Sequence, residues 1–373
     1  MKGMAIVDKG LEDVAIEEIN EKIKSKGKKA EYSIIFDIAK EEDLCKLAYT
    51  SQSVRRIMLL LKEFKVEKNL KKSISQFQKD VKKDLLKKYI SKNAKIECER
   101  IGEHDFNSVD FAREVSKILH EQGFEVSRTE NEITFYIYIN GNKGYLSLDF
   151  SGKDLSKREY RVFTKPGSLK GTLAYALVRI AHYKPGEIIL DPYCESGVVP
   201  IEATLMAINK PVHFYKKDFA FKQINKKFEK VFKEQDKKIK KKEKGINALD
   251  KTLGNVNSAK KNAKIAGVDK IINFSKADIE WLDTKFDKES VDKVITKLPA
   301  ESKRFAKNKV ELIYKELFYQ LEFILKKNGT AVICTMKNEL LKQIASEKKF
   351  KTMTEQTIFS GQQEFTVTTF QKN

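Results

Sequence analysis

The amino-acid sequence predicts an α/β protein whose C-terminal half is built on a mainly parallel β-sheet. The chain has 373 residues, which is too many for one ordinary hydrophobic core and enough for two or three domains. Hydrophobic residues make up 41% of the chain, so globular cores can form. From about residue 164 onward, short apolar runs alternate with helical segments, and this alternation is typical of parallel strands connected by helices.

The periodicity of apolar residues divides the chain into three regions. Residues 1–70 alternate strand-like and helical stretches, which predicts a small α+β unit. Residues 71–163 predict a basic helix followed by a strand, another helix and two strands, and residues 164–373 predict the parallel sheet. The helices expected in the first two regions cover residues 11–24, 42–48, 74–89 and 109–120. The expected strands cover residues 4–7, 32–37, 56–61, 94–99, 132–138, 144–149, 188–191, 245–250, 271–275, 293–296 and 330–335, and a terminal hairpin is expected at 356–371.

The chain is strongly basic. Lysine and arginine number 73 against 53 aspartates and glutamates, which gives a net charge of +20 at pH 7. Such an excess favours a polyanionic partner, because basic side chains release counterions from it when they bind. A chain that uses lysine on all its surfaces has the same composition. The lysine-dense segment 222–244 has two corresponding interpretations, a solvated helix or loop and an arm that contacts phosphates, and we favour the first.

The cysteines and histidines do not form a metal-binding pattern. The four cysteines contain no CxxC pair, and the four histidines do not cluster with them at the spacing of metal ligands. We therefore expect free thiols in a reducing cytosol and no metal site. No apolar run is long enough for a membrane span, and no signal peptide opens the chain, so a cytoplasmic protein without a membrane partner is expected.

Two stretches of the second region carry a specific pattern. Residues 100–108 read RIGEHDFNS, and residues 145–161 read YLSLDFSGKDLSKREYR, a strand and a turn followed by a cationic exit. Together they resemble the THUMP domain of RNA-modifying enzymes. Residues 1–70 suit the ferredoxin-like unit that precedes this domain in such families, and the segment 53–60, SVRRIMLL, fits its end.

The cationic exit is the expected RNA-binding element of this half. The resemblance implies that Lys157, Arg158 and Arg161 contact RNA, with the single-stranded end of the acceptor arm of tRNA as the expected partner. Arginine suits this role because its guanidinium can bind a phosphate with two hydrogen bonds. The alternative is that Arg158 and Arg161 connect two domains.

Residues 187–203 combine an apolar strand, a tight loop and a helix, and they read EIILDPYCESGVVPIEA. They resemble motif I of amino-methyltransferases, in which the loop reads DPxCGSG and the glycines let the backbone approach the cofactor. Here Glu195 replaces the first loop glycine, and its side chain either points away or obstructs the cofactor. The resemblance implies an S-adenosylmethionine site that includes Asp191, Cys194, Glu195, Gly197 and Glu202.

Two further acids follow the next expected strands. Asp250 ends the strand at 245–250, where such families place an acid that accepts the ribose hydroxyls. Asp278 follows the strand at 271–275, where an acid accepts the adenine amine. Three acids after three successive strands support a class I methyltransferase fold with a Rossmann-like domain at 164–373. By the same resemblance, this domain follows a ferredoxin-like unit at 1–70 and a THUMP domain at 71–163.

The loop after the fourth strand is expected to hold the catalytic residues. In enzymes that methylate exocyclic amines it reads Asn or Asp, Pro or Leu, Pro, aromatic: oxygens accept the amine hydrogens, and the ring stacks on the base. The corresponding residues here are Lys297, Leu298, Pro299 and Ala300. Lys297 can only donate hydrogen bonds and Ala300 cannot stack. Thr296 and Glu301 are alternative acceptors.

These observations leave two main functional hypotheses. The resemblance implies an S-adenosylmethionine-dependent methyltransferase that acts on the exocyclic amine of a guanine in tRNA. The replaced loop residues favour a relative that binds tRNA or another RNA without methylating it. A third hypothesis, a DNA amine methyltransferase, does not account for the THUMP-like stretch at residues 95–162.

Overall fold

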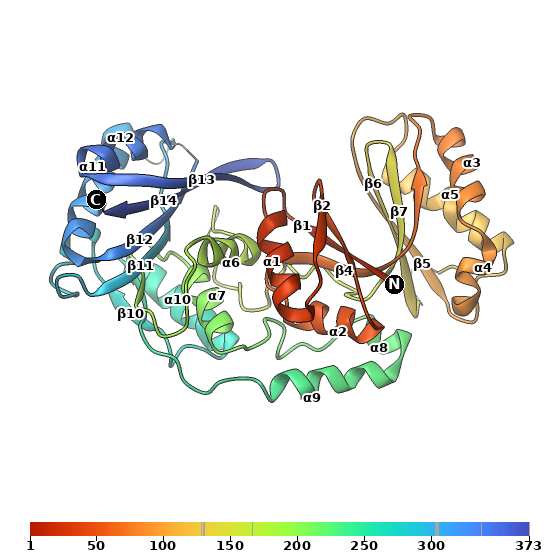
Figure 1. Cartoon of the computed structure of the whole chain (residues 1–373), viewed down its shortest axis with the longest axis horizontal. Helices are drawn as coiled ribbons and strands as arrows, with labels where there is room; N and C mark the ends of the chain where they lie inside the picture. The colour runs from red at the N-terminus through yellow and green to blue at the C-terminus, as the bar shows by residue number, and fades with distance from the viewer. Residues whose placement is uncertain (128, 130, 166, 303–305, 337, 373) are drawn as a thin grey trace. The chain divides into compact units, whose positions relative to one another are not determined.

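The computed structural model describes residues 1–127, 129, 131–165, 167–302, 306–336 and 338–372 (Figure 1). The chain forms two compact units, each with its own sheet. Unit 1 consists of Met1–Val7, Ile16–Leu155 and Lys217–Glu234. Unit 2 consists of Asp8–Ala15, Ser156–Lys216 and Gln235–Asn373.

Unit 1 is built on a seven-stranded sheet in the order β2-β3-β1-β4-β7-β6-β5. Its strands are β1 (Lys2–Val7), β2 (Gly27–Ala30), β3 (Ser33–Asp37), β4 (Val54–Lys65), β5 (Ala94–Ile101), β6 (Ile133–Asn140) and β7 (Lys143–Asp149). All neighbouring strands are antiparallel except β5 and β6. Because β4 pairs with both β1 and β7, one sheet runs through the regions 1–70 and 71–163, and their division into two domains stays a prediction.

The helices of this unit differ from the expectation at one place. They are α1 (Glu12–Ile23), α2 (Glu41–Thr50), α3 (Leu70–Asp80), the short α4 (Lys83–Leu86), the 3₁₀-helix η1 (Lys87–Tyr89) and α5 (Ser108–Glu121). The single basic helix expected at 74–89 is wrong, because Val81 adopts an extended backbone and ends α3. The β-branched Val81 side chain is buried there, so packing overrides the local helical pattern. Figure 1 shows α3 and α5 beside the β5–β7 part of the sheet.

The lysine-dense segment begins with α8 (Phe221–Ile224), the 3₁₀-helix η2 (Lys226–Glu229) and α9 (Lys230–Asp236). Phe228, Val231 and Phe232 are buried on one side of it, and the Phe232 ring meets that of Tyr49 edge to face at 4.9 Å. The segment is therefore not solvated on all sides. A phosphate contact by its lysines stays a prediction.

Unit 2 contains the parallel sheet that the sequence predicts. Its strands are β8 (Ile189–Asp191), β9 (Ile246–Asp250), β10 (Asn273–Lys276), β11 (Val291–Lys297), β12 (Leu325–Thr335), β13 (Phe350–Ser360) and β14 (Gln363–Lys372), in the order β10-β9-β8-β11-β12-β14-β13. The first five of this order are parallel, and β14 runs antiparallel to β12 and β13. The expected strands and the terminal hairpin are confirmed, although β10 begins later than expected.

Helices cover both faces of this sheet. One core includes residues of α6 (Gly171–Ile180), α7 (Val198–Ala207) and α10 (Leu253–Ala266) together with Ile295. The other includes residues of α11 (Lys307–Ile324) and α12 (Glu339–Glu347) together with Val294. Because side chains alternate along a strand, these neighbours of β11 point to opposite faces. The strand order reverses between β8 and β11, and open α/β sheets bind ligands beyond the carboxyl ends of such strands.

Candidate cofactor and catalytic site

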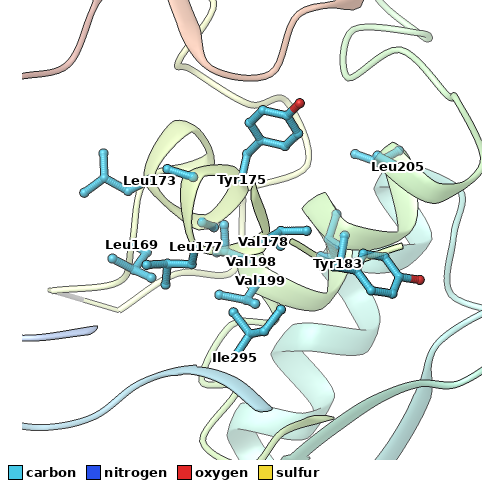
Figure 2. Packing of buried hydrophobic residues seen from close by; sticks show 14 of the residues in the cluster. Leu169, Leu173, Tyr175, Leu177, Val178, Tyr183, Val198, Val199, Leu205 and Ile295 are labelled. Carbon is cyan, nitrogen blue, oxygen red and sulfur yellow. The ribbon is translucent and has the colours of Figure 1, made fainter. Parts of the chain in front are cut away.

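The loop after β8 is held by a buried helix and a glycine. Nearly all side chains of α7 are buried, and Figure 2 shows Val198 and Val199 packed among residues of α6 and near Ile295. Gly197 caps this helix with φ = 78°, and a Cβ there would lie 2.8 Å from the Cβ of Ala259. Glycine is required on both counts, since the left-handed backbone and the close approach of α10 exclude a side chain.

Glu195 has a backbone conformation that favours glycine. Its φ is 47°, in the left-handed region, which costs a residue with a side chain about 1–2 kcal/mol. The Glu195 N–H donates to Oδ2 of Asp250 at 3.1 Å, and this bond helps to hold the loop. A glycine would adopt this backbone without strain, whereas the carboxylate of Glu195 changes the charge of the site.

The Glu195 side chain turns toward the catalytic loop and meets Lys297. The Lys297 Nζ lies 3.9 Å from Oε1 of Glu195 and donates to the carbonyl of Gly167 at 2.7 Å. Burial raises the pKa of Glu195, while the charges of Lys297 and Lys165 oppose this rise. The cavity around the pair has a volume of only about 10 Å³, room for about one water molecule. Its lining consists of Leu169, Asp191, Tyr193, Cys194, Glu195, Ser196, Val198, Val199 and Lys297.

The two later acids have different surroundings. Asp250 is 1% exposed, and its Oδ1 accepts from the Thr252 N–H at 2.8 Å and from Asn255 Nδ2 at 2.9 Å. With the Glu195 N–H on its other oxygen, the carboxylate is engaged by three donors of its own chain. Asp278 is partly exposed and lines a cavity of about 80 Å³. Asp278 is therefore the acid open to a ligand in this conformation.

Some residues of the site are absent from the sequence prediction. Tyr193 lines both the Asp278 cavity and the Lys297–Glu195 cavity. Asn255 and Asn262 lie on one face of α10, two turns apart; Asn262 donates to the Ser196 carbonyl at 2.9 Å. Asn262 could have been found from the sequence, because residues 258–268 resemble the corresponding helix of the family. Tyr193 could have been found because it lies inside the DPYC motif.

Asp191 is a buried acid at the end of β8. It accepts hydrogen bonds from Thr296 Oγ1 at 2.7 Å and from the Tyr193 N–H at 3.2 Å. Burial raises its pKa to about 7, although these two bonds act in the opposite direction. Thr296 donates its hydroxyl proton in this contact and is itself buried, so its oxygen is not exposed to a substrate amine in this conformation.

We expect Asp191 to make the protein less stable as the pH rises from about 4 to about 7. Its folded-state pKa of about 7 lies above the ordinary 3.8, so the folded state holds a proton that the unfolded chain releases. The contribution of the Asp191 proton to the free energy of unfolding is complete below the pKa of the unfolded state and is lost as the pH rises through the pKa of the folded state. It amounts to about 1.4 kcal/mol for each unit by which the two pKa values differ. Urea denaturation of the wild type and of Asp191→Asn should show a difference in unfolding free energy that falls across this window and then levels. A constant difference would contradict the raised pKa.

Arg158 and Glu202, which the sequence assigns to RNA and to the cofactor, form an ion pair with each other. Arg158 Nε donates to Oε1 of Glu202 at 2.9 Å, both side chains are 0% exposed, and the Tyr160 hydroxyl donates to the same oxygen at 2.6 Å. Both side chains are buried and neutralise each other inside unit 2, so in this conformation Arg158 faces no RNA phosphate and Glu202 faces no cofactor.

The remaining cations of the exit segment differ in their exposure. Arg161 is half-buried, its guanidinium donates to the Ser168 carbonyl at 3.4 Å, and burial lowers its pKa. Lys157 is exposed. That Lys157 and Arg161 contact RNA stays a prediction. The exposed Lys157 is better placed for such a contact than the half-buried Arg161.

The catalytic loop keeps its backbone support. Leu298 is buried and its N–H donates to the Cys334 carbonyl at 3.0 Å, while the Pro299 carbonyl accepts from the Tyr314 hydroxyl at 2.7 Å. Ala300 is half-buried and Glu301 is exposed. Lys297 is the residue of this loop that meets the motif I loop through an ion pair. The carboxylate facing the catalytic loop is therefore that of Glu195.

Several global features bear on the remaining expectations. Cys45, Cys98, Cys194 and Cys334 are free, and Cys194, predicted at the cofactor site, is buried with a raised pKa because of desolvation. Within the described ranges, no group of three or more His, Cys, Asp or Glu side chains could hold a metal ion. In the same part of the chain, no helix has the length and apolar character needed to cross a membrane.

Known proteins resemble this chain along most of its length. A tRNA (guanine(6)-N2)-methyltransferase of Archaeoglobus fulgidus is 26% identical over 356 residues, which cover 92% of this chain and 85% of the relative. A protein of the same name from Methanocaldococcus jannaschii is 27% identical over 273 residues, covering 70% and 71% of the two chains.

Solved structures establish the same fold. TrmN from Thermus thermophilus has a TM-score of 0.74 at 19% identity and matches 100% of this chain and 99% of its own. A methyltransferase crystallised with SAH has a TM-score of 0.83 at 17% identity, with 100% and 98% covered. The predicted class I methyltransferase fold is confirmed. The family model UPF0020, described as the RMKL-like methyltransferase domain, matches residues 158–365, more than half of the chain. The chain therefore belongs to the RMKL-like methyltransferase family, whose cofactor is S-adenosylmethionine.

Proposed function

We propose that this protein is a cytoplasmic enzyme that methylates the N2 amine of a guanine in tRNA. The observation that carries the proposal is the extent of the likeness to the Archaeoglobus fulgidus tRNA (guanine(6)-N2)-methyltransferase, which covers 92% of this chain. The likeness extends well beyond the methyltransferase domain at residues 158–365. A shared N-terminal half supports a shared substrate class, because that half is not needed to hold the cofactor.

Unit 1 is the proposed RNA-binding part, with a ferredoxin-like portion at 1–70 and a THUMP domain at 71–163. The net charge of +20 supports a polyanionic substrate. The lysine-dense segment supports it too, since Lys226, Lys227 and Lys233 are exposed while its aromatic residues are buried. A rigid apolar base for exposed lysines suits contacts to phosphates.

The cofactor fits the site best at its adenosine end. The partly exposed Asp278 would accept the adenine amine beside Ile279, Tyr193 and Leu312, which line the same cavity. Asp250 already accepts from three donors of its own chain, which leaves its carboxylate about one acceptor position for a ribose hydroxyl. When bound, the cofactor supplies an electrophilic methyl group. The chain must then present the guanine amine and receive its proton, for which Leu298 and Pro299 offer backbone and Glu195 a carboxylate.

The alternative function, RNA binding without methylation, is favoured by one observation. Lys297 occupies the position of the amine-polarising residue and can only donate hydrogen bonds, and it engages the nearby Glu195 carboxylate in an ion pair. The two functions differ in whether a methyl group is transferred, while both require salt-sensitive binding of RNA.

We expect transfer of labelled methyl groups from S-adenosylmethionine to unmodified tRNA transcripts, recovered as N2-methylguanosine after nuclease digestion. The affinity for tRNA should fall steeply between low and high salt, because phosphate contacts dominate it. Ribosomal RNA fragments and DNA oligonucleotides are the matched controls. Label in ribosomal RNA alone would overturn the substrate class. Tight, salt-sensitive tRNA binding without transfer, in a protein that binds cofactor, would establish the alternative.

A further inference from the structure

An exposed aromatic ring of unit 2 lies beside a lysine of α10. The Phe163 side chain is 39% exposed, and that of the preceding Val162 is 61% exposed. The Nζ atom of Lys261 lies 4.9 Å from the centre of the Phe163 ring. An exposed ring next to cations is typical of surfaces that bind single-stranded nucleic acids.

The backbone of Phe163 is fixed by one buried side chain. Its N–H donates to Asn262 Oδ1 at 2.9 Å, and its carbonyl accepts from Asn262 Nδ2 at 3.0 Å. The same Nδ2 donates to the Ser196 carbonyl, in the loop after β8, at 2.9 Å. Four positions after Phe163, the Gly167 carbonyl accepts from Lys297 of the catalytic loop. The Phe163 backbone is therefore tied to the candidate site, and a change of its side chain leaves these bonds in place.

The exposed side of α10 is positively charged. Its sequence, LGNVNSAKKNAKIA, contains three lysines and no acid, whereas α11 and α12 carry both signs of charge. Lys264 comes four residues after Lys260 and three after Lys261, so these exposed lysines lie on one side of the helix. They line a groove of about 520 Å³ beside β10, an edge strand of the sheet. Among the described residues, the rest of the lining consists of Asp269, Ile272, Asn273 and Phe274.

The ring and the lysines together indicate the chemistry of a ligand. A base whose exocyclic amine is to be methylated must leave its helical stack, so a neighbouring base loses a stacking partner. An aromatic side chain offers a replacement surface to any base, because every base has a π-face. Lysines bind the phosphates of the same strand without regard to sequence. An RNA segment with unpaired bases therefore fits both parts of this surface.

We propose that Phe163 stacks on an unpaired base next to the target nucleotide, while Lys260, Lys261 and Lys264 contact the phosphates of that strand. This inference rests on the proposed function, since it requires an RNA substrate. In the structure Lys261 lies over the ring. A cation–π contact at an exposed site is weak, so a base can take the place of the ammonium. The displaced ammonium then contacts a phosphate.

Two other roles for these residues make different predictions. If Phe163 only contributes to the stability of unit 2, its replacement changes the unfolding free energy and leaves the affinity for RNA unchanged. If the three lysines only add to the overall charge, any three exposed lysines of unit 2 contribute equally to RNA binding. The proposed surface instead predicts a loss of affinity that depends on position and, at Phe163, on aromatic character.

The test measures the affinity for an unmodified tRNA transcript by fluorescence anisotropy at several salt concentrations. Phe163→Leu should bind about tenfold more weakly with the same dependence on salt, because stacking is lost and no charge changes. Phe163→Trp should bind at least as well as the wild type. Combined Lys260→Gln, Lys261→Gln and Lys264→Gln should lower the affinity and reduce the slope of log affinity against log salt by about 2.

The matched control is combined Lys285→Gln, Lys288→Gln and Lys327→Gln. It removes the same charge from exposed lysines near the amino ends of β11 and β12, away from the ligand-binding end of the sheet. This control should weaken tRNA binding much less than the α10 variant. All variants should bind S-adenosylhomocysteine as the wild type does, which shows that the loop after β8 is undisturbed.

Several results would overturn the inference alone, in a wild type that binds tRNA. They are an unchanged affinity in Phe163→Leu, an equal loss in the two lysine variants, and a loss in Phe163→Leu that is matched by weaker binding of S-adenosylhomocysteine. A wild type that does not bind tRNA would overturn the proposed function, and the inference with it.

Discussion

Replacement of Arg158 by alanine is expected to lower the free energy of unfolding by about 3–5 kcal/mol. The change removes the partner of Glu202, whose side chain is 0% exposed and would be left as an uncompensated buried charge. The hydrogen bond from the Tyr160 hydroxyl remains, but it carries no charge. The pair is tightly packed, because a Cβ at Gly171 would lie 2.5 Å from Arg158 Nε and 2.7 Å from Glu202 Oε1. Urea denaturation of the variant and the wild type measures the effect.

The neighbouring residue supplies the matched control for this variant. Lys157 is exposed, so Lys157→Ala should change the unfolding free energy by no more than about 0.5 kcal/mol. If Lys157 contacts a phosphate, its loss should instead weaken tRNA binding and reduce the dependence of affinity on salt. An Arg158→Ala variant as stable as the wild type, with weak tRNA binding, would return Arg158 to the RNA surface.

Restoration of both loops to the family pattern, as Glu195→Gly with Lys297→Asn and Ala300→Tyr, is expected to raise the rate of methyl transfer about 10²-fold. Asparagine supplies the oxygen that accepts an amine hydrogen, whereas the Lys297 ammonium opposes the positive charge that develops as the amine attacks. Tyrosine supplies a surface for the base, and such stacking is worth about 1–3 kcal/mol. The assay is transfer of labelled methyl to unmodified tRNA at saturating cofactor.

The single variants separate the contributions to this effect. Lys297→Asn alone removes the ion partner of Glu195, whose carboxylate is partly buried, so this variant should gain less than the combined one. Ala300→Tyr alone tests the stacking term in the presence of the intact pair. Saturating cofactor removes differences in cofactor affinity from the comparison. If the wild type transfers methyl groups rapidly and the restored loops lower this rate, Lys297 and Glu195 themselves take part in the methyl transfer.

The sequence by itself determined the parts of this protein that depend on local patterns. The strand that ends at Asp191, the left-handed Gly197 and the buried helix after it follow from an apolar run, a tight turn and helical periodicity. Asp250 and Asp278 follow from the same regularity, because Asp250 is the last residue of β9 and Asp278 comes two residues after the end of β10. These features need only neighbouring residues, so one sequence predicts them.

Only the tertiary structure decided which charges meet. Arg158 lies in a segment rich in basic residues that reads as a phosphate-binding exit, yet it pairs with Glu202, 44 positions away, in a fully buried contact. Glu195 and Lys297 read as two separate defects until the order of β8 and β11 in the sheet brings their loops together. The physical reason is that a charge's role depends on its burial and its partner, and both are set by the sheet order and the packing of distant segments rather than by the residues beside it in the chain.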